Sequence, residues 1–130
     1  MPTVDDVRGV DLVRSELAHD PTVDITTTGR RTGLPRRLEI WMVDADGRFF
    51  VTGTTGRRDW IANLNANPSL VVHLKRHAHV DLAARAIPVD DAETRRAVFE
   101  HENAEWYRTQ QPIDVLVETA PMVEVIFGPS

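Results

Sequence analysis

The chain of 130 residues has no cysteine, a single tyrosine and a single lysine. The lack of cysteine excludes disulfides and thiolate metal sites. No apolar run approaches the about 20 residues of a membrane-spanning helix, and the first residues lack the basic-then-apolar layout of a signal peptide. We therefore expect a cytoplasmic protein without an integral membrane segment, and the length fits one domain over residues 1–130.

Several catalytic motifs are also absent. The sequence has no G-x-S-x-G elbow, no Walker loop and no G-x-G-x-x-G turn after a first strand, which disfavours hydrolases and the common nucleotide-binding folds. His73, His77 and His79 resemble a metal cluster, but two of them lie at or beyond an expected turn and no H-E-x-x-H motif accompanies them. We predict no metal site.

Positive charge is concentrated in the middle of an acidic chain. The net charge is −5, yet residues 25–76 hold nine basic and four acidic side chains. Nucleic-acid binders usually present a broad basic surface, and a small basic patch suits a compact anion better. Almost all of the basic residues are arginine, whose guanidinium matches phosphate and carboxylate with two parallel hydrogen bonds. We expect no nucleic-acid partner.

Apolar periodicity and turn residues predict a mainly β chain with short helices. The segment that begins at residue 36 alternates, with Leu38, Ile40 and Met42 on one face and charged residues on the other. Asp59 is the expected N-cap of a short helix. The expected elements are helix 5–18, strand 23–28, turn 29–35, strand 36–44, hairpin 44–47, strand 48–53, loop 54–58, helix 60–66, strand 69–75, strand 78–88, helix 90–107 and strand 121–127. Six strands joined mostly by hairpins predict a six-stranded antiparallel barrel of the α+β class.

Two segments share one composition. The first, TGRRTGLPRR, is a glycine-containing turn with threonine hydroxyls and paired arginines. The second, TGTTGRR, has the same ingredients and leads into a helix. Backbone N–H groups, hydroxyls and guanidiniums together bind anions, and the N-terminus of a helix favours them. Each segment alone also fits a solvated turn, whereas the pair favours a phosphate or polyanionic ligand.

Three tryptophans and the tyrosine are the candidate ring contacts. Trp41 lies on the charged face of its strand, where a flat indole can stack on a planar cofactor, although a buried tryptophan is the commoner outcome. Trp60 begins the short helix after the second segment, and Trp106 and Tyr107 end the long acidic helix.

Between residues 23 and 75 the chain resembles the deazaflavin-dependent nitroreductases, split β-barrels related to the FMN-binding pyridoxamine 5'-phosphate oxidase-like fold. The resemblance rests on a strand that ends in Thr-Thr-Gly-Arg-Arg-Thr-Gly, a following Pro-Arg, a strand–turn–strand, and a loop into Trp-x-x-Asn-Leu and Asn-Pro. Glu39 and the short second loop depart from the longer members of that family.

The resemblance implies coenzyme F420 as the cofactor, with FMN as the alternative. F420 has an anionic phosphodiester and an oligoglutamate tail, which agrees with the anion site inferred from the residues. The cofactor-binding residues it implies are Arg30, Arg31, Thr32, Gly33, Trp41, Thr54, Thr55, Gly56, Arg57, Arg58, Trp60 and Asn63. Trp106 or Tyr107 would line the substrate side, and Tyr107 is the candidate catalytic proton donor.

The resemblance also implies a reaction. Reduced F420 would give a hydride to a small electron acceptor such as a quinone, an enone or a nitroaromatic, while the protein binds and orients both partners. Two alternatives stay open, an FMN-binding oxidoreductase and a flavin- or lipid-binding protein without turnover. Because related barrels pair across their sheet faces, we expect a homodimer.

Overall fold

The structure is a computed structural model that describes residues 6–56 and 58–128. The elements are α1 (Asp6–Leu17), β1 (Thr22–Thr28), β2 (Pro35–Ala45), β3 (Arg48–Thr52), α2 (Asp59–Ala66), β4 (Ser69–Leu74), β5 (Val80–Pro88), α3 (Ala92–Glu100), the 3-10 helix η1 (Glu102–Ala104), α4 (Glu105–Gln110), α5 (Ile113–Thr119) and β6 (Met122–Phe127). All six strands were predicted, each to within two residues at either end.

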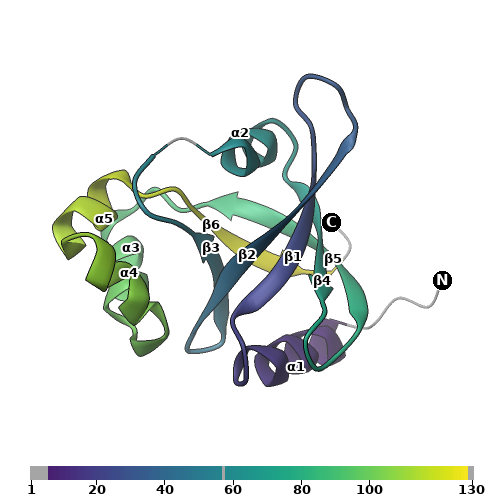
Figure 1. Ribbon diagram of the computed structural model, residues 1–130, viewed down its shortest axis with the longest axis horizontal. Coiled ribbons are helices and arrows are strands. Elements are labelled where there is room, and N and C mark those ends of the chain that lie inside the picture. Colours follow the sequence, from purple (N-terminus) through teal and green to yellow (C-terminus); the bar gives the residue numbers. More distant parts are fainter. Residues whose placement is uncertain (1–5, 57, 129–130) are drawn as a thin grey trace.

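The six strands close into one barrel in the order β1-β2-β3-β6-β5-β4 (Figure 1). Every neighbouring pair is antiparallel. The predicted six-stranded antiparallel barrel is therefore confirmed. The β2–β3 hairpin turns at Asp46 and Gly47, whose φ angles are 56° and 89°, as a two-residue turn with two left-handed residues requires.

Alternation along β2 decides which side chains fill the barrel. Leu38, Ile40 and Met42 pack in the interior cluster, together with Val23 and Ile25 of the paired strand β1. The side chains between them face outward, as the period of two predicts. The register of this pair therefore follows from the sequence pattern.

Helices cover the two ends and one outer face of the barrel (Figure 1). Val13 of α1 and Trp60 of α2 enter the interior cluster from opposite ends. The helices α3, α4 and α5 form a second cluster with Val43 and Phe50, which point outward from β2 and β3. No helix within the described residues is long and apolar enough to span a bilayer.

The prediction of one helix over residues 90–107 is wrong. The chain leaves the helical conformation at His101, with φ −65° and ψ 145°, and continues as η1 and α4. The guanidinium of Arg108 donates to the carbonyls of Phe99 and His101 at 2.6 and 2.9 Å. Arg108 thus supplies hydrogen-bond donors to two carbonyls that lose their helical partners where the helix ends.

Helix α5 was not predicted. Residues 113–119 place Ile113, Val115 and Val117 at every second position, a spacing that is closer to a strand than to a helix, with the apolar Leu116 between the two valines. Tertiary contacts decide the outcome. The buried guanidinium of Arg95 donates to Val117 O at 2.6 Å and also to Leu116 O and Ala120 O, so α3 supplies donors for the free carbonyls at the end of α5.

The start of α2 also differs from the expectation. Asp59 is the first helical residue, and Arg58 is the N-cap, with no hydrogen bond from its side chain to the helix end. Asp59 still favours the helix, because a carboxylate in the first turn faces the positive end of the helix dipole.

Candidate functional site

The turn between β1 and β2 is closed by its own backbone. Gly29 N donates to Leu34 O at 2.8 Å, and Gly33 N donates to Gly29 O at 2.8 Å. Gly33 has a φ of +70°, which other residues adopt only with strain. A Cβ on Gly29 would lie 2.9 Å from Thr32 Oγ1 and 3.2 Å from Leu34 O. Both glycines of the first segment are therefore required by its shape.

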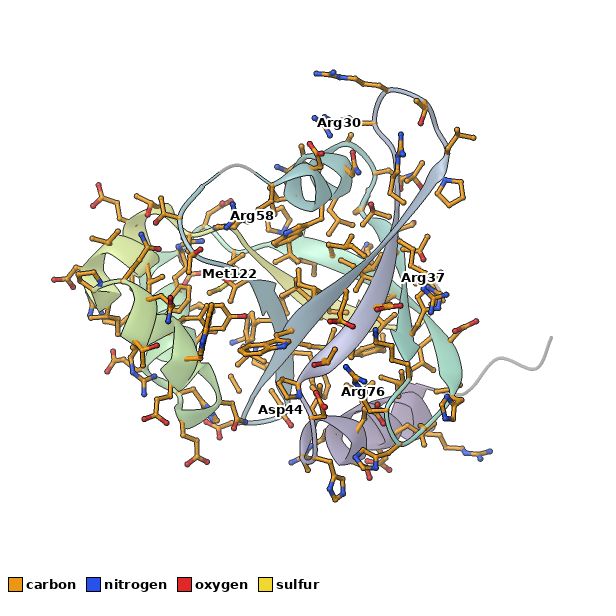
Figure 2. The ribbon with its side chains drawn as sticks, in the orientation of Figure 1. Arg30, Arg37, Asp44, Arg58, Arg76 and Met122 are labelled. Carbon is orange, nitrogen blue, oxygen red and sulfur yellow. The ribbon has the colours of Figure 1, made fainter. Side chains whose placement is uncertain are left out.

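A cavity of about 540 Å³ lies between this turn, β2 and the start of α2. It extends beside the Arg30 end of the molecule in Figure 2. Its lining residues are Thr27, Gly29, Arg30, Arg31, Thr32, Arg36, Arg37, Leu38, Asp59, Trp60 and Asn63. Four guanidiniums thus surround one concave space that has a single carboxylate, Asp59.

The arginines of the cavity differ in what they bind. Arg37 Nε donates to Asp24 at 2.9 Å, and Arg30 bonds to α2. Arg31 and Arg36 have no hydrogen bond or ion pair within the described residues, a property they share there with Arg85 alone. Two guanidiniums that line one cavity and have no partner in the described part of the chain have the donors that an anion requires.

Asn63 and Asp59 hold the Arg30 side chain against α2. Arg30 Nη1 donates to Asn63 Oδ1 at 3.0 Å, and Arg30 Nη2 lies 3.4 Å from Asp59 Oδ1. Asn63 Oδ1 also accepts from the backbone N–H of Arg30 at 3.1 Å. The first segment and α2 are therefore joined at the edge of the cavity.

Ion pairs on the outer face fix the strands beside the cavity. Lys75 Nζ lies 2.7 Å from Asp24 and 2.5 Å from Glu39. Burial opposes ionisation of Asp24, but the hydrogen bonds from Lys75 and Arg37 outweigh it and lower the pKa of Asp24 below its usual value. Arg37 is therefore neutralised by the protein and is a weaker candidate for ligand binding than Arg31 or Arg36.

The second segment lies apart from this cavity. Thr55 N donates to Gln111 Oε1 at 2.7 Å, and Thr55 Oγ1 lies 2.5 Å from Thr119 Oγ1. Arg58 Nη2 donates to Thr54 Oγ1 at 3.2 Å. The segment is thus bonded to the helical layer, and its Arg57 lies outside the described residues.

The structure brings only part of the predicted site together. Arg30, Arg31, Thr32, Trp60 and Asn63 line the cavity. The other predicted residues lie elsewhere among the described residues, namely Gly33, Trp41, Thr54, Thr55, Gly56, Arg58 and Tyr107.

An aromatic pair connects β2 to α4. The rings of Trp41 and Trp106 are 5.2 Å apart at 71°, and both side chains are exposed, at 37% and 46%. Trp106 also contacts Tyr107 edge-on at 5.2 Å. The indoles predicted separately for the cofactor side and the substrate side are therefore neighbours.

Tyr107 lies in the second hydrophobic cluster, only 4% exposed. Burial raises the pKa of Tyr107 to about 12, so the phenol keeps its proton throughout the neutral range. The structure does not bring Tyr107 to the arginine cavity.

The histidine pattern has a structural explanation. His73 Nδ1 lies 2.7 Å from Asp81 Oδ1, and His73 Nε2 lies 2.6 Å from Thr26 Oγ1, so both ring nitrogens are engaged. No group of three or more potential metal ligands gathers within residues 6–56 and 58–128.

Arg36 lines the cavity but was not predicted as a site residue. The Pro-Arg pair within the first segment carried the signal, because Pro35 starts β2 and Arg36 and Arg37 directly after it both line the cavity. Register with β1 places Arg36 opposite Thr27, another lining residue.

Comparison with known proteins gives one family match and several fold matches. Residues 4–120 match the model of the F420H2-dependent quinone reductase family. A Clostridium acetobutylicum protein related to general stress protein 26 of B. subtilis, of the pyridoxinephosphate oxidase family, is similar with a TM-score of 0.69 and 15% identity, over 95% of this chain and 86% of that one.

Two further solved structures share the fold. The F420-H2 dependent reductase FDR-A has a TM-score of 0.53 and 20% identity, over 82% of this chain and 94% of that one. A protein described as a domain-swapped dimer has a TM-score of 0.56 and 19% identity, over 90% of this chain and 98% of that one. At these identities the structures establish a shared fold, and the family match covers most of the chain.

Proposed function

Because the chain belongs to the family of F420H2-dependent quinone reductases, we propose that it is an oxidoreductase that transfers a hydride from reduced F420 to a quinone. The observation that carries the proposal is the pair Arg31 and Arg36, which line one cavity and have no partner among the described residues. F420 has an anionic phosphodiester and a glutamate tail, and forked cations in a concave site suit both groups. When bound, the cofactor supplies the hydride chemistry.

Arg31 and Arg36 bind the anionic part of the cofactor in this proposal. Thr32 contributes a hydroxyl, although this hydroxyl also accepts from Leu34 N at 3.2 Å. Trp60 provides an apolar wall, 5% exposed, from the first turn of α2. The chain thus offers charge, a hydroxyl and a flat surface within one cavity, as expected for a site that binds an anionic cofactor with a planar head.

The exposed pair Trp41 and Trp106 is the proposed contact for the acceptor. Exposed indoles are costly to leave in water and offer flat apolar faces to a planar ring. Tyr107 is not part of this proposal, because it is only 4% exposed and does not line the arginine cavity. Trp106→Ala should raise KM for a soluble naphthoquinone severalfold and leave KM for reduced F420 unchanged.

Parallel titrations with F420 and FMN, followed by tryptophan fluorescence, test the proposal. We expect F420 to bind at micromolar concentration and its reduced form to be oxidised by a quinone faster than by an enone or a nitroaromatic. If FMN binds and F420 does not, the cofactor assignment is wrong. If F420 binds but no acceptor oxidises its reduced form, the chain is a binding protein.

The proposal also includes a cytoplasmic homodimer. A similar fold forms the domain-swapped dimer described above, and no helix of the described residues lies over the outer face of β1 (Figure 1). Size-exclusion chromatography with light scattering would give the mass in solution, and cell fractionation of the full chain would give the location. A monomer at all concentrations would exclude the dimer.

A further inference from the structure

We infer that Asn63 is a positioning residue that acts through Arg30. Arg30 itself connects the β1–β2 turn to α2 and does not bind the cofactor's anionic group. The inference rests on the proposed function, since it concerns how the anion site is assembled. It reassigns two residues that the sequence placed among the cofactor contacts.

The hydrogen bonds of Asn63 are directed at the protein. Asn63 is only 4% exposed. Its Oδ1 accepts from the N–H and from Nη1 of Arg30 at 3.1 and 3.0 Å, and its Nδ2 donates to Thr27 Oγ1 at 3.3 Å. Both lone pairs of the oxygen and one of the two amide N–H groups are thereby used. Little capacity is left for a ligand.

The Arg30 side chain is directed at α2. Its Nη1 donates to Asn63 and its Nη2 faces Asp59, so the guanidinium bridges the first and second turns of α2. Figure 2 shows Arg30 where the β1–β2 turn passes α2. Next to it in sequence, Arg31 has no such bond within the described residues.

The three contacts together lock the turn onto the helix. Thr27 ends the cavity side of β1, Arg30 begins the turn, and Asn63 reaches both from α2. Trp60 lies three residues before Asn63 on the same helical face and lines the same cavity. Asn63 therefore fixes both the direction in which Arg31 points and the distance between the turn and Trp60.

The first test is Asn63→Leu, which keeps the approximate volume and removes all three hydrogen bonds. We expect the F420 dissociation constant to rise about tenfold, the scale of one lost hydrogen bond to a charged group, with kcat at saturation nearly unchanged. The matched control is Asn65→Leu on the exposed face of α2, which should leave the affinity unchanged. An unchanged affinity in Asn63→Leu would overturn the inference.

A double-mutant cycle separates positioning from direct binding. If Asn63 acts through Arg30, the effect of Asn63→Leu is smaller when Arg30 is already replaced by methionine, because coupled residues are non-additive. The part that remains reflects the bond from the Arg30 backbone N–H, which methionine keeps. If the two losses simply add, the Arg30 side chain does not carry the effect of Asn63 and the inference is wrong.

Amide hydrogen exchange of the cofactor-free protein tests the lock without any ligand. Asn63→Leu should speed exchange of the Arg30 amide at least about tenfold, since that N–H loses its acceptor, while Asn65→Leu should not. Slow exchange in Asn63→Leu contradicts the inference even if F420 binds. Absence of F420 binding by the native chain contradicts the proposed function and leaves the exchange result valid.

Asn63→Asp covers the case in which the leucine variant does not fold. The aspartate keeps an acceptor oxygen for Arg30 and loses the donor to Thr27. The Arg30 amide should therefore stay protected. Fast exchange in a folded Asn63→Asp protein would show that the oxygen does not hold the turn, and would overturn the inference.

Discussion

The two ends of the barrel use charged groups in opposite ways. At the α1 end, the carboxylate of Glu16 is 1% exposed and accepts from the N–H groups of Arg76, His77 and Ala78 at 2.8, 3.0 and 2.8 Å. At the α2 end, Arg31 and Arg36 face a cavity without a partner in the described residues. Figure 2 shows Arg76 beside α1 and Arg30 beside α2, at opposite ends.

The difference indicates which end stabilises the fold and which end is available to a ligand. A buried carboxylate with three backbone donors stabilises the folded state, and its burial keeps solutes away from it. Neighbouring cations without counter-ions repel one another, so their arrangement contributes little to stability and favours an anion instead. Substitutions at the α1 end should therefore change stability, and substitutions at the α2 end should change affinity.

The largest expected effect is on cofactor affinity in the double variant Arg31→Ala with Arg36→Ala. Loss of two charge-assisted contacts should weaken F420 binding about a hundredfold, roughly 2.7 kcal/mol, by the scale of hydrogen bonds to charged groups. The melting temperature should stay the same or rise slightly. Fluorescence titration and calorimetry measure the two quantities.

Arg85→Ala is the matched control for that variant. Arg85 is also exposed and unpaired within the described residues, but it lies on β5 outside the cavity. The control should bind F420 as the native chain does. If Arg85→Ala weakens binding as much as the double variant, net charge explains the effect and the cavity does not.

The next effect concerns stability and its pH dependence at the α1 end. Glu16→Gln should lower the free energy of unfolding by about 2 kcal/mol at pH 7, the scale of lost hydrogen bonds to a buried charge, without changing F420 affinity. Burial alone would raise the pKa of Glu16, but the backbone donors outweigh it and hold the pKa below its ordinary 4.5.

The sign of the pH dependence follows from that lowered pKa. The stabilisation by Glu16 is fully present above its unfolded pKa of 4.5 and is lost as the pH falls through the lower folded value. Urea unfolding of both proteins between pH 3 and pH 7 should show curves that converge toward acid. A constant gap down to pH 3 would mean that ionisation of Glu16 is not the source.

The smallest expected effect concerns Gly33 and Gly47, two glycines that both have a positive φ angle. Gly33 and Gly47 have φ angles of 70° and 89°, and neither has a heavy atom within 4 Å of an added Cβ. Alanine at either position should cost about 1 kcal/mol of stability, the usual strain of a left-handed residue. Only Gly33→Ala should also weaken F420 binding, because only that turn carries Arg31. If Gly33→Ala and Gly47→Ala bind F420 with equal affinity, the β1–β2 turn is not part of the cofactor site.

The barrel strands could be predicted from the sequence because alternation and turn residues lie within each strand or hairpin. The alternation in β2 and the Asp46–Gly47 turn are enough to set the faces and the hairpin, and the structure has both. The helical layer is different. Helix α5 has strand-like alternation, and it forms because Arg95 supplies donors to its last carbonyls, a long-range contact that no local pattern contains.

The candidate site could be predicted only in part for the same reason. Composition identified the first segment and its arginines, and the family pattern gave Trp60 and Asn63. Composition alone could not distinguish Arg31, which has no partner in the described part of the chain, from Arg37, which Asp24 neutralises. It also grouped two similar segments that the structure separates, since Thr55 bonds to Gln111 in the helical layer.

Side-chain NMR of the arginines during an F420 titration tests the central claim most directly. The Nε–H signals of Arg31 and Arg36, assigned with the Arg31→Lys and Arg36→Lys variants, should shift and saturate with the binding curve. The reason is that they gain hydrogen bonds from the cofactor, whereas none forms to them within residues 6–56 and 58–128. The signals of Arg48, paired with Glu124 at 2.8 Å, and of Arg85 should stay in place. Saturable binding that leaves the Arg31 and Arg36 signals unmoved would contradict the account.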